Sequence, residues 1–242
     1  MSEREDLLRR IKANILKNGY HVTLVTSKEL PRFAYTIGCT EILGFELIFA
    51  GGEYYSKDDI SRIIDQHVRE LQKGVDWKTL LLTVNSLGYF SLTVADKSWS
   101  ELLALGVFDY YNRDDIQILQ ILPDKDHFTL DTPDMSRKFE VDLQPVWCWL
   151  VKEWDYPVPR NSTAVTNLKV LFGEKATEVM RWEVDEWEIF CGAGPEVQKE
   201  DMRALPLAIL IGIDKTLEPA LFLQIDKGIW RDSVDLIWND WG

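Results

Sequence analysis

The sequence has little histidine and cysteine, the residues most often used as metal ligands and as nucleophiles. The three histidines, His21, His67 and His127, form neither an HExxH motif nor a cluster with cysteine, which excludes the common zinc patterns. The three cysteines lie far apart without CxxC spacing. We therefore expect no metal site and no disulfide framework, and a reducing compartment fits this cysteine usage.

Recognisable catalytic and phosphate-binding motifs are also missing. There is no GxSxG nucleophile elbow, and no glycine-rich loop has the spacing of a P-loop or of a dinucleotide-binding turn. Cys39 and His21 would form a Cys–His pair only if the fold brought them together, and a small buried thiol is the commoner situation for such a cysteine. The sequence thus predicts no catalytic residue and no cofactor.

Long hydrophobic segments are absent. The longest apolar run, residues 205–213, contains Pro206 and Gly212 and is too short to span a bilayer, so we interpret it as a buried strand. The first ten residues carry charges of both signs and no apolar stretch typical of a signal peptide. We expect a cytoplasmic protein that does not bind membranes.

Basic side chains are outnumbered, with 27 Lys and Arg against 40 Asp and Glu and a formal net charge of −13. This negative field repels phosphate backbones, which argues against nucleic-acid binding, and it attracts basic proteins. The alternative explanation of the negative charge is that it only keeps the protein soluble. The ten tryptophans are unusual, because tryptophan is enriched both in cores and at interface hot spots.

Hydrophobic periodicity predicts an α+β protein with a mainly antiparallel sheet, two to three packed helices and a strand-rich C-terminal module. The expected domain is 1–150, followed by a proline-containing hinge at 151–160 and the C-terminal module at 161–242. Helices are predicted at 2–18, where Ser2 is a candidate N-cap, 56–74 and 98–105. Strands are predicted at 20–26, 33–38, 45–50, 80–84, 89–95, 116–122, 165–172, 179–184, 187–191, 205–213 and 220–225.

The strand at 33–38 has a marked asymmetry. Phe33, Tyr35 and Ile37 point to one face, and the smaller Ala34, Thr36 and Gly38 point to the other. Small residues permit close approach, which predicts either tight packing of a helix or a ligand groove. The residues at such a groove are His21, Tyr35 and Thr36.

The same segment, Phe-Ala-Tyr-Thr-Ile-Gly at 33–38 with Gly44 and the Glu-Leu pair at 46–47, resembles the bacterial family called domain of unknown function 4262. Tyr110-Tyr111 and Pro123-Asp124 extend the resemblance, which covers roughly residues 5–135. It implies a bacterial, cytoplasmic α+β domain without established chemistry, sometimes encoded near toxin systems. Cys39 stands where the family usually has an apolar residue, commonly leucine, which argues against a catalytic role for this thiol.

Two functional hypotheses remain open. The first is a non-catalytic binding protein, an immunity-type inhibitor of a basic toxin, which uses an acidic, tryptophan-rich contact segment. The second is a small-molecule-binding or enzymatic domain with its site beside the 33–38 strand. For two of the contact candidates, the tryptophans, core positions in adjoining strands are the favoured interpretation. The candidate contact residues are Trp182, Glu183, Asp185, Glu186 and Trp187. The oligomeric state is left open.

Overall fold

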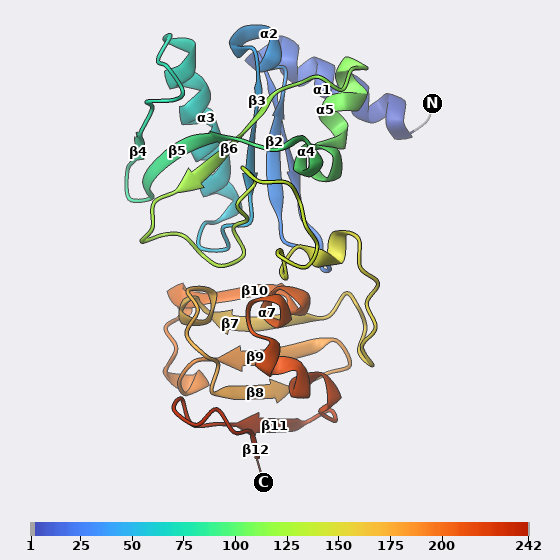
Figure 1. Cartoon of the computed structure of the whole chain (residues 1–242), viewed down its shortest axis with the longest axis vertical. Coiled ribbons are helices and arrows are strands. Elements are labelled where there is room, and N and C mark those ends of the chain that lie inside the picture. Colours follow the sequence, from blue (N-terminus) through green and yellow to red (C-terminus); the bar gives the residue numbers. More distant parts are fainter. Residues whose placement is uncertain (1–2, 242) are drawn as a thin grey trace. The chain divides into compact units, whose positions relative to one another are not determined.

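The computed structural model describes residues 3–241, which divide into two compact units (Figure 1). The N-terminal unit contains residues 3–25, 32–128 and 134–139, and the C-terminal unit contains residues 26–31, 129–133 and 140–241. The division thus comes earlier in the chain than the hinge expected at 151–160, and that segment belongs entirely to the C-terminal unit. Ser2, the candidate N-cap, lies outside the described residues.

The N-terminal unit is built on a six-stranded sheet of order β1-β2-β3-β6-β5-β4, in which only β3 and β6 are parallel. Its strands are β1 (His21–Val25), β2 (Phe33–Ile37), β3 (Glu46–Ala50), β4 (Leu82–Val84), β5 (Gly88–Val94) and β6 (Ile118–Pro123). Its helices are α1 (Glu3–Asn18), α2 (Thr40–Leu43), α3 (Lys57–Gln72), α4 (Lys97–Leu103) and α5 (Leu105–Tyr111).

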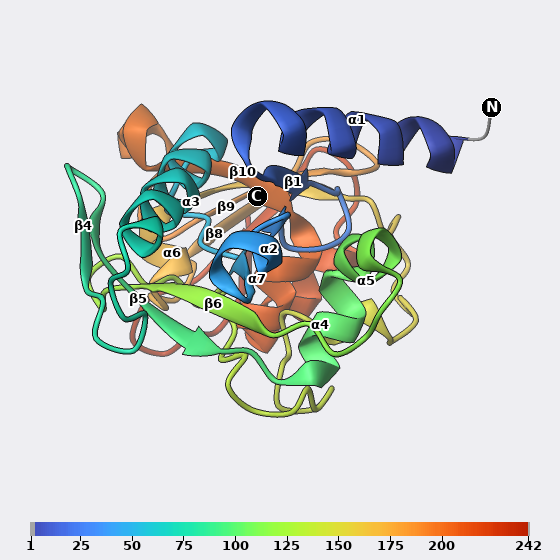
Figure 2. The ribbon, with the colours of Figure 1, turned by 90° about the horizontal axis from the view of Figure 1, so that it is seen from above.

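Helices cover both faces of this sheet. Ser56 and Asp59 form a capping box that starts α3, whose apolar stripe packs on the face carrying Ala34 and Phe49. On the opposite face Gly106 of α5 lies so close to Tyr35 that a methyl group there would meet the tyrosine hydroxyl. Seen from above, α3 lies on one side of the strands and α4 and α5 on the other (Figure 2).

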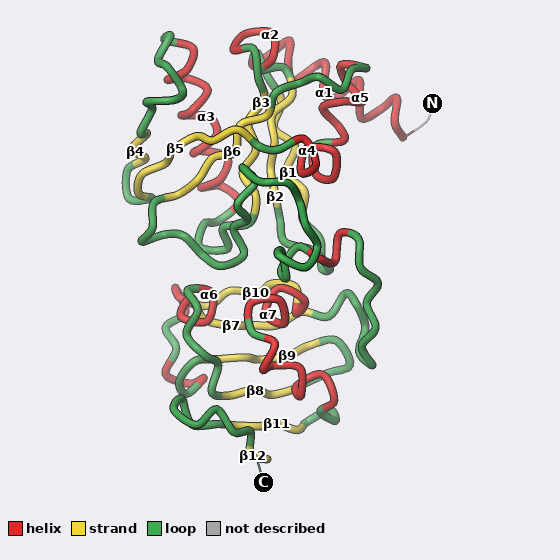
Figure 3. Tube along the Cα trace, viewed as in Figure 1, coloured by secondary structure: helices red, strands yellow, loops and turns green. Residues whose placement is uncertain are grey.

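The C-terminal unit contains a second six-stranded sheet, whose strands follow one another in the order β10-β7-β9-β8-β11-β12 (Figure 3). In this sheet β7 and β9 are parallel. The strands are β7 (Thr163–Asn167), β8 (Glu178–Arg181), β9 (Glu186–Phe190), β10 (Met202–Pro206), β11 (Lys227–Trp230) and β12 (Asn239–Asp240). The α-helices are α6 (Leu168–Leu171) and α7 (Leu207–Ile213). The 3₁₀ helices are η1 (Cys148–Leu150), η2 (Gly194–Glu196), η3 (Lys199–Asp201) and η4 (Lys215–Phe222).

These elements confirm the α+β class, with all but one strand pair antiparallel in each sheet. The strand predicted at 205–213 is wrong: the chain leaves β10 at Pro206 and continues as the helix α7, buried along almost its whole length. The strand predicted at 220–225 is also wrong, because the chain up to Phe222 belongs to the 3₁₀ helix η4. A short run that is apolar at every position has no period, so sequence alone does not separate a buried strand from a buried helix. No helix in residues 3–241 is both long and apolar enough to cross a membrane.

Candidate functional site

The family-like segment of the N-terminal unit is organised around the fully buried carboxylate of Glu46, at the start of β3. Its Oε2 accepts a hydrogen bond from Thr36 Oγ1 (2.5 Å), and its Oε1 accepts from the backbone N of Thr40 (2.9 Å) and from the Tyr111 hydroxyl (2.9 Å). The backbone N–H of Gly38 and the Thr40 hydroxyl also donate to Oε1, at 3.1 and 2.8 Å. The carboxylate is saturated with donors, so it stabilises the 37–46 loop instead of serving as an acid or base.

Cys39 lies inside the same loop and is fully buried. Burial, and next the negative charge of Glu46, raise the pKa of its thiol to about 12. His21 is occupied elsewhere, since its Nδ1 lies 2.9 Å from Asn14 Nδ2 and burial lowers the pKa of its imidazole. The two side chains therefore form no activated Cys–His pair.

The three residues expected at a ligand groove are not brought into one groove. Thr36 is buried against Glu46, whereas Tyr35 points to the other face of the sheet and packs under α5. Only His21 lines a hollow, a polar one of about 610 Å³ beside the edge strand β1. Gly38 adopts a positive φ of +108°, and a Cβ there would lie 3.1 Å from Ile15 of α1, so the small residue serves close helix packing.

The C-terminal sheet differs because α7 and η4 cover only one of its faces. On that covered face Trp187 is 1% exposed, and its indole Nε1 donates to the carbonyl of Ala220 in η4 (3.3 Å). The next residues along the strands, such as Glu188, point the other way and are only partly buried. We call this second face, carried by β7, β8, β9 and β11, the open face.

One row of register partners crosses the open face. Val165 pairs with Glu188, Glu188 with Met180, and Met180 with Gly228. Beside Gly228 the backbone N of Trp241 donates to the Gly228 carbonyl (3.0 Å). A Cβ at position 228 would lie only 2.8 Å from Cε3 of Trp241, so the missing side chain makes room for this indole ring on the sheet.

A hollow of about 600 Å³ lies over this row. Its floor includes Val165, Met180 and Phe190, and two tryptophans, Trp182 and Trp241, line it. The charged residues that line it are three acidic ones and one basic one: Glu178, Glu188, Asp226 and Lys227. The combination of apolar floor, indole rings and excess carboxylate is suited to an apolar group that carries positive charge.

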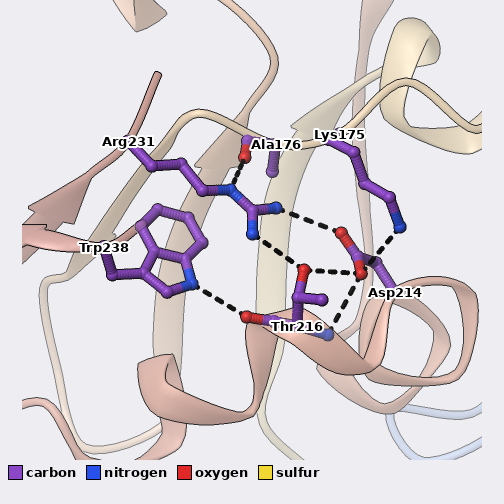
Figure 4. A network of polar contacts seen from close by, with 6 residues as sticks. All are labelled: Lys175, Ala176, Asp214, Thr216, Arg231 and Trp238. Carbon is purple, nitrogen blue, oxygen red and sulfur yellow. Dashed lines mark hydrogen bonds and ion pairs between the residues drawn. The ribbon is translucent and has the colours of Figure 1, made fainter. Parts of the chain in front are cut away.

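The C-terminal segment that supplies Trp241 is fastened by a buried ionic network (Figure 4). The Arg231 guanidinium donates to Asp214 Oδ2 (3.1 Å), to Thr216 Oγ1 (2.8 Å) and to the Ala176 carbonyl (2.6 Å). Trp238 lies 4.1 Å from this guanidinium in a cation–π contact and donates to the Thr216 carbonyl (2.8 Å). Burial acts to raise the pKa of Asp214, but hydrogen bonds from Thr216 and Lys175 outweigh it, and the pKa is lowered.

The predicted contact residues fall on both sides of the C-terminal sheet. Trp182 is 45% exposed and lines the hollow, and Glu186 is exposed on the open face. Glu183 is exposed and Asp185 half-buried in the turn between β8 and β9. Trp187 belongs to the core, so its side chain is not available to a partner.

Other residues of this site were not singled out from the sequence. Val165, Met180 and Glu188 alternate with buried neighbours, and this alternation is the signal that would have placed them on one face. No local signal marks Trp241, because only the pairing of β11 with β12 brings it beside the row.

The two units also differ in charge. The C-terminal unit carries 21 acidic and 11 basic side chains, a net −10, whereas the N-terminal unit carries 19 and 16, a net −3. Most of the negative charge of the chain is therefore concentrated in the unit with the open face.

Within residues 3–241 no group of three or more histidine, cysteine or acidic residues is arranged to hold a metal ion. Asp124 and His127 form instead a turn in which the carboxylate accepts from the backbone N of Tyr89 (2.7 Å) and lies 2.8 Å from the imidazole Nδ1.

Comparison with known proteins gives a match to one protein family. No curated protein and no solved structure matches the chain. Residues 14–129 match the family described as "Domain of unknown function (DUF4262)". This range contains Thr36, Glu46 and Tyr111, the side chains of the buried carboxylate centre. The resemblance inferred from the 33–38 motif is thereby confirmed, and the N-terminal part of the chain is similar to the DUF4262 family.

Proposed function

We propose that this chain is a non-catalytic, cytoplasmic binding protein that holds a basic protein partner on the open face of its C-terminal unit. The finer form of this proposal is an immunity-type inhibitor of a basic toxin. The observation that carries it is the open face itself, where Trp182, Trp241 and the carboxylates of Glu186 and Glu188 share one uncovered sheet surface.

The charge distribution supports a basic partner. A unit with a net charge of −10 accelerates the approach of a cationic protein by long-range attraction. The same charge opposes a second copy of this chain on the open face, because an isologous contact would place like carboxylates against one another. Tryptophans in a partly desolvated hollow are the residue type that most often contributes large binding energies.

The absence of an activated nucleophile in the family-like segment is consistent with a binding role. There the carboxylate of Glu46 is fully hydrogen-bonded and the Cys39 thiol is buried with a raised pKa. The carboxylate of Glu46 stabilises the loop, and the thiol of Cys39 fills the core.

The test is affinity purification from the native host at low salt, comparing the wild-type chain with the double variant E186K/E188K. We expect a basic protein to be retained by the wild type, released by salt and lost from the variant. A matched control is E41K/D58K, which changes the net charge equally at exposed positions of the N-terminal unit and should retain the partner.

Inhibition is tested separately with the purified partner. We expect one equivalent of this chain to abolish the partner's activity, and co-expression to rescue cell growth. Equal retention by wild type and E186K/E188K would exclude the open face as the contact surface, and a bound but fully active partner would exclude the inhibitor form.

The polar hollow beside β1 supports the alternative of a small-molecule site. It is lined by Asn14, Tyr20, His21, Asp65 and Arg69, whose groups suit a small polar ligand. A ligand that stays bound in a native mass spectrum and is lost in the H21A variant would favour this alternative.

A further inference from the structure

The carboxylate of Glu188 is in an unusual place for an acidic side chain. Its register partners on the two neighbouring strands are Val165 and Met180, so an apolar side chain flanks it on each side of the open face. Glu188 is partly buried, and no ion pair to it is found among residues 3–241. A partner that covers this face must either supply a cation to Glu188 or leave a desolvated, uncompensated charge.

The residues that line the hollow indicate which kind of cationic group it would bind. Trp182 and Trp241 line it, and indole rings attract cations through their π faces. The volume of about 600 Å³ is larger than one compact ammonium group requires and leaves room for a long side chain. Arginine combines an apolar stem with a planar, weakly hydrated guanidinium that stacks on aromatic rings and binds carboxylates in a bidentate fashion.

From these observations we propose that the hollow is the receptor for an arginine side chain of the partner protein. The methylene stem contacts Met180 and Val165, and the guanidinium pairs with Glu188 beside the two indole rings. This inference rests on the proposed function, since it names the partner residue that the open face recognises.

Other occupants fit less well. An apolar side chain would leave Glu188 without a counter-charge, and an acidic one would be repelled by Glu178, Glu188 and Asp226. Among the described residues, the only basic one in the lining of the hollow is Lys227, whose register partner Arg181 pairs in turn with Trp187 of the covered face, so a net negative charge remains for the ligand to neutralise.

The experiment uses the full chain labelled with ¹⁵N and two matched probes, N-acetyl-arginine amide and N-acetyl-citrulline amide. Citrulline has nearly the shape of arginine but no charge. The indole N–H signals of Trp182 and Trp241 are assigned with W182F and W241F. We expect arginine to shift both signals, with a Kd on the order of a millimolar, and citrulline to bind at least tenfold more weakly.

Two variants make the test specific. E188Q removes the charge at the proposed site and should weaken arginine binding about tenfold or more. E183Q removes an equal charge from the turn between β8 and β9, which does not line the hollow, and should leave binding unchanged within about twofold. Equal binding of arginine and citrulline, no binding of either, or equal loss in both variants would overturn the arginine receptor.

The outcome is separable from that of the proposed function. If the arginine probe fails but the partner is still retained by the wild type and lost from E186K/E188K, the open face binds a basic protein through another residue. If the arginine probe binds at Glu188 but no partner depends on the face, the receptor stands and the inhibitor proposal fails.

Discussion

The two units contain sheets of equal size with one parallel strand pair each, yet they use their faces differently. In the N-terminal unit helices cover both faces, and every residue of β2 and β3 is buried. In the C-terminal unit helices cover one face of the sheet, and the open face carries Trp182 and Glu188. A covered face constrains its side chains through packing, whereas an open face leaves them available for recognition. The comparison assigns a stabilising role to the covered faces, and the open face is the one on which we propose binding.

The largest effect is expected from breaking the buried network of the C-terminal unit. R231A leaves the buried Asp214 with Lys175 as the one cation of the described residues that pairs with it, which should lower the free energy of unfolding of this unit by about 3–5 kcal/mol. Hydrogen exchange of the backbone amides of β8 and β11 measures this loss of unfolding free energy. The control R113A removes a solvent-exposed pair with Asp115 and should leave the free energy of unfolding nearly unchanged. A loss below about 1 kcal/mol in R231A would show that the network is dispensable.

A second large effect concerns His67 of α3, which is fully buried with Nδ1 2.8 Å from the Ile63 carbonyl. Burial lowers the pKa of its imidazole from 6.5 to about 4. As the pH falls, the imidazole is therefore protonated in the unfolded chain before it is protonated in the folded protein. The contribution of neutral His67 to the free energy of unfolding is fully present above pH 6.5 and is lost as the pH falls to about 4. The loss attributable to His67 is about 3 kcal/mol.

The variant H67L tests this pH dependence. We expect the difference in unfolding free energy between wild type and H67L to change in that pH interval, measured by urea denaturation at several pH values. A difference independent of pH would mean that the folded protein protonates His67 at an ordinary pKa.

A smaller effect is expected at the carboxylate centre. T36V keeps the shape of the side chain but removes the hydroxyl that donates to Glu46 and accepts from the backbone N of Leu47 (2.9 Å). We expect a loss of about 1–3 kcal/mol in thermal or urea unfolding, because two buried polar groups lose a partner. T83V, at an exposed position of β4, is the matched control and should change stability by less than about 0.5 kcal/mol. Equal effects in the two variants would contradict a stabilising role for the centre.

The smallest effect on stability is expected on the open face. W182A should change the free energy of unfolding by less than about 1 kcal/mol, while it abolishes partner retention. W187A, five residues away but on the covered face, should cost about 3–5 kcal/mol. If the two variants destabilise equally in urea denaturation, the open face is not free of packing constraints.

The regular elements were predictable because their signals are local. The apolar stripe and the Ser56–Asp59 capping box of α3 lie within one stretch of chain, and the structure confirms this helix at Lys57–Gln72. The six strands before residue 124 lie within two residues of the positions predicted from the sequence. In the C-terminal unit short helices directly follow strands, as α6 follows β7. The hydrophobic period then changes from that of a strand to that of a helix within a short apolar run, and so short a run does not show in the sequence where the strand ends.

The site was harder to predict because it depends on strand register. The Glu46 centre joins residues 65 positions apart, Glu46 and Tyr111, and no local pattern indicates that contact. Trp182 and Trp187 lie in one hairpin with the same composition around them, and the turn between β8 and β9 places them on opposite faces. Composition thus indicated an acidic, tryptophan-rich binding surface, and only the register says which side chains form it.

The segment between β1 and β2 has a consequence for how this chain can be divided. Residues 26–31 belong to the C-terminal unit, where Leu30 packs with the cluster around Trp149 and Glu29 pairs with Arg160 (2.9 Å). No single cut separates the two units, since a fragment beginning at residue 140 lacks both this segment and residues 129–133. During synthesis the first part of the C-terminal unit leaves the ribosome more than a hundred residues before the rest of it. The second unit is therefore completed only after its strand β12 has emerged, and dissection of the protein requires circular permutation or grafted loops in place of truncation.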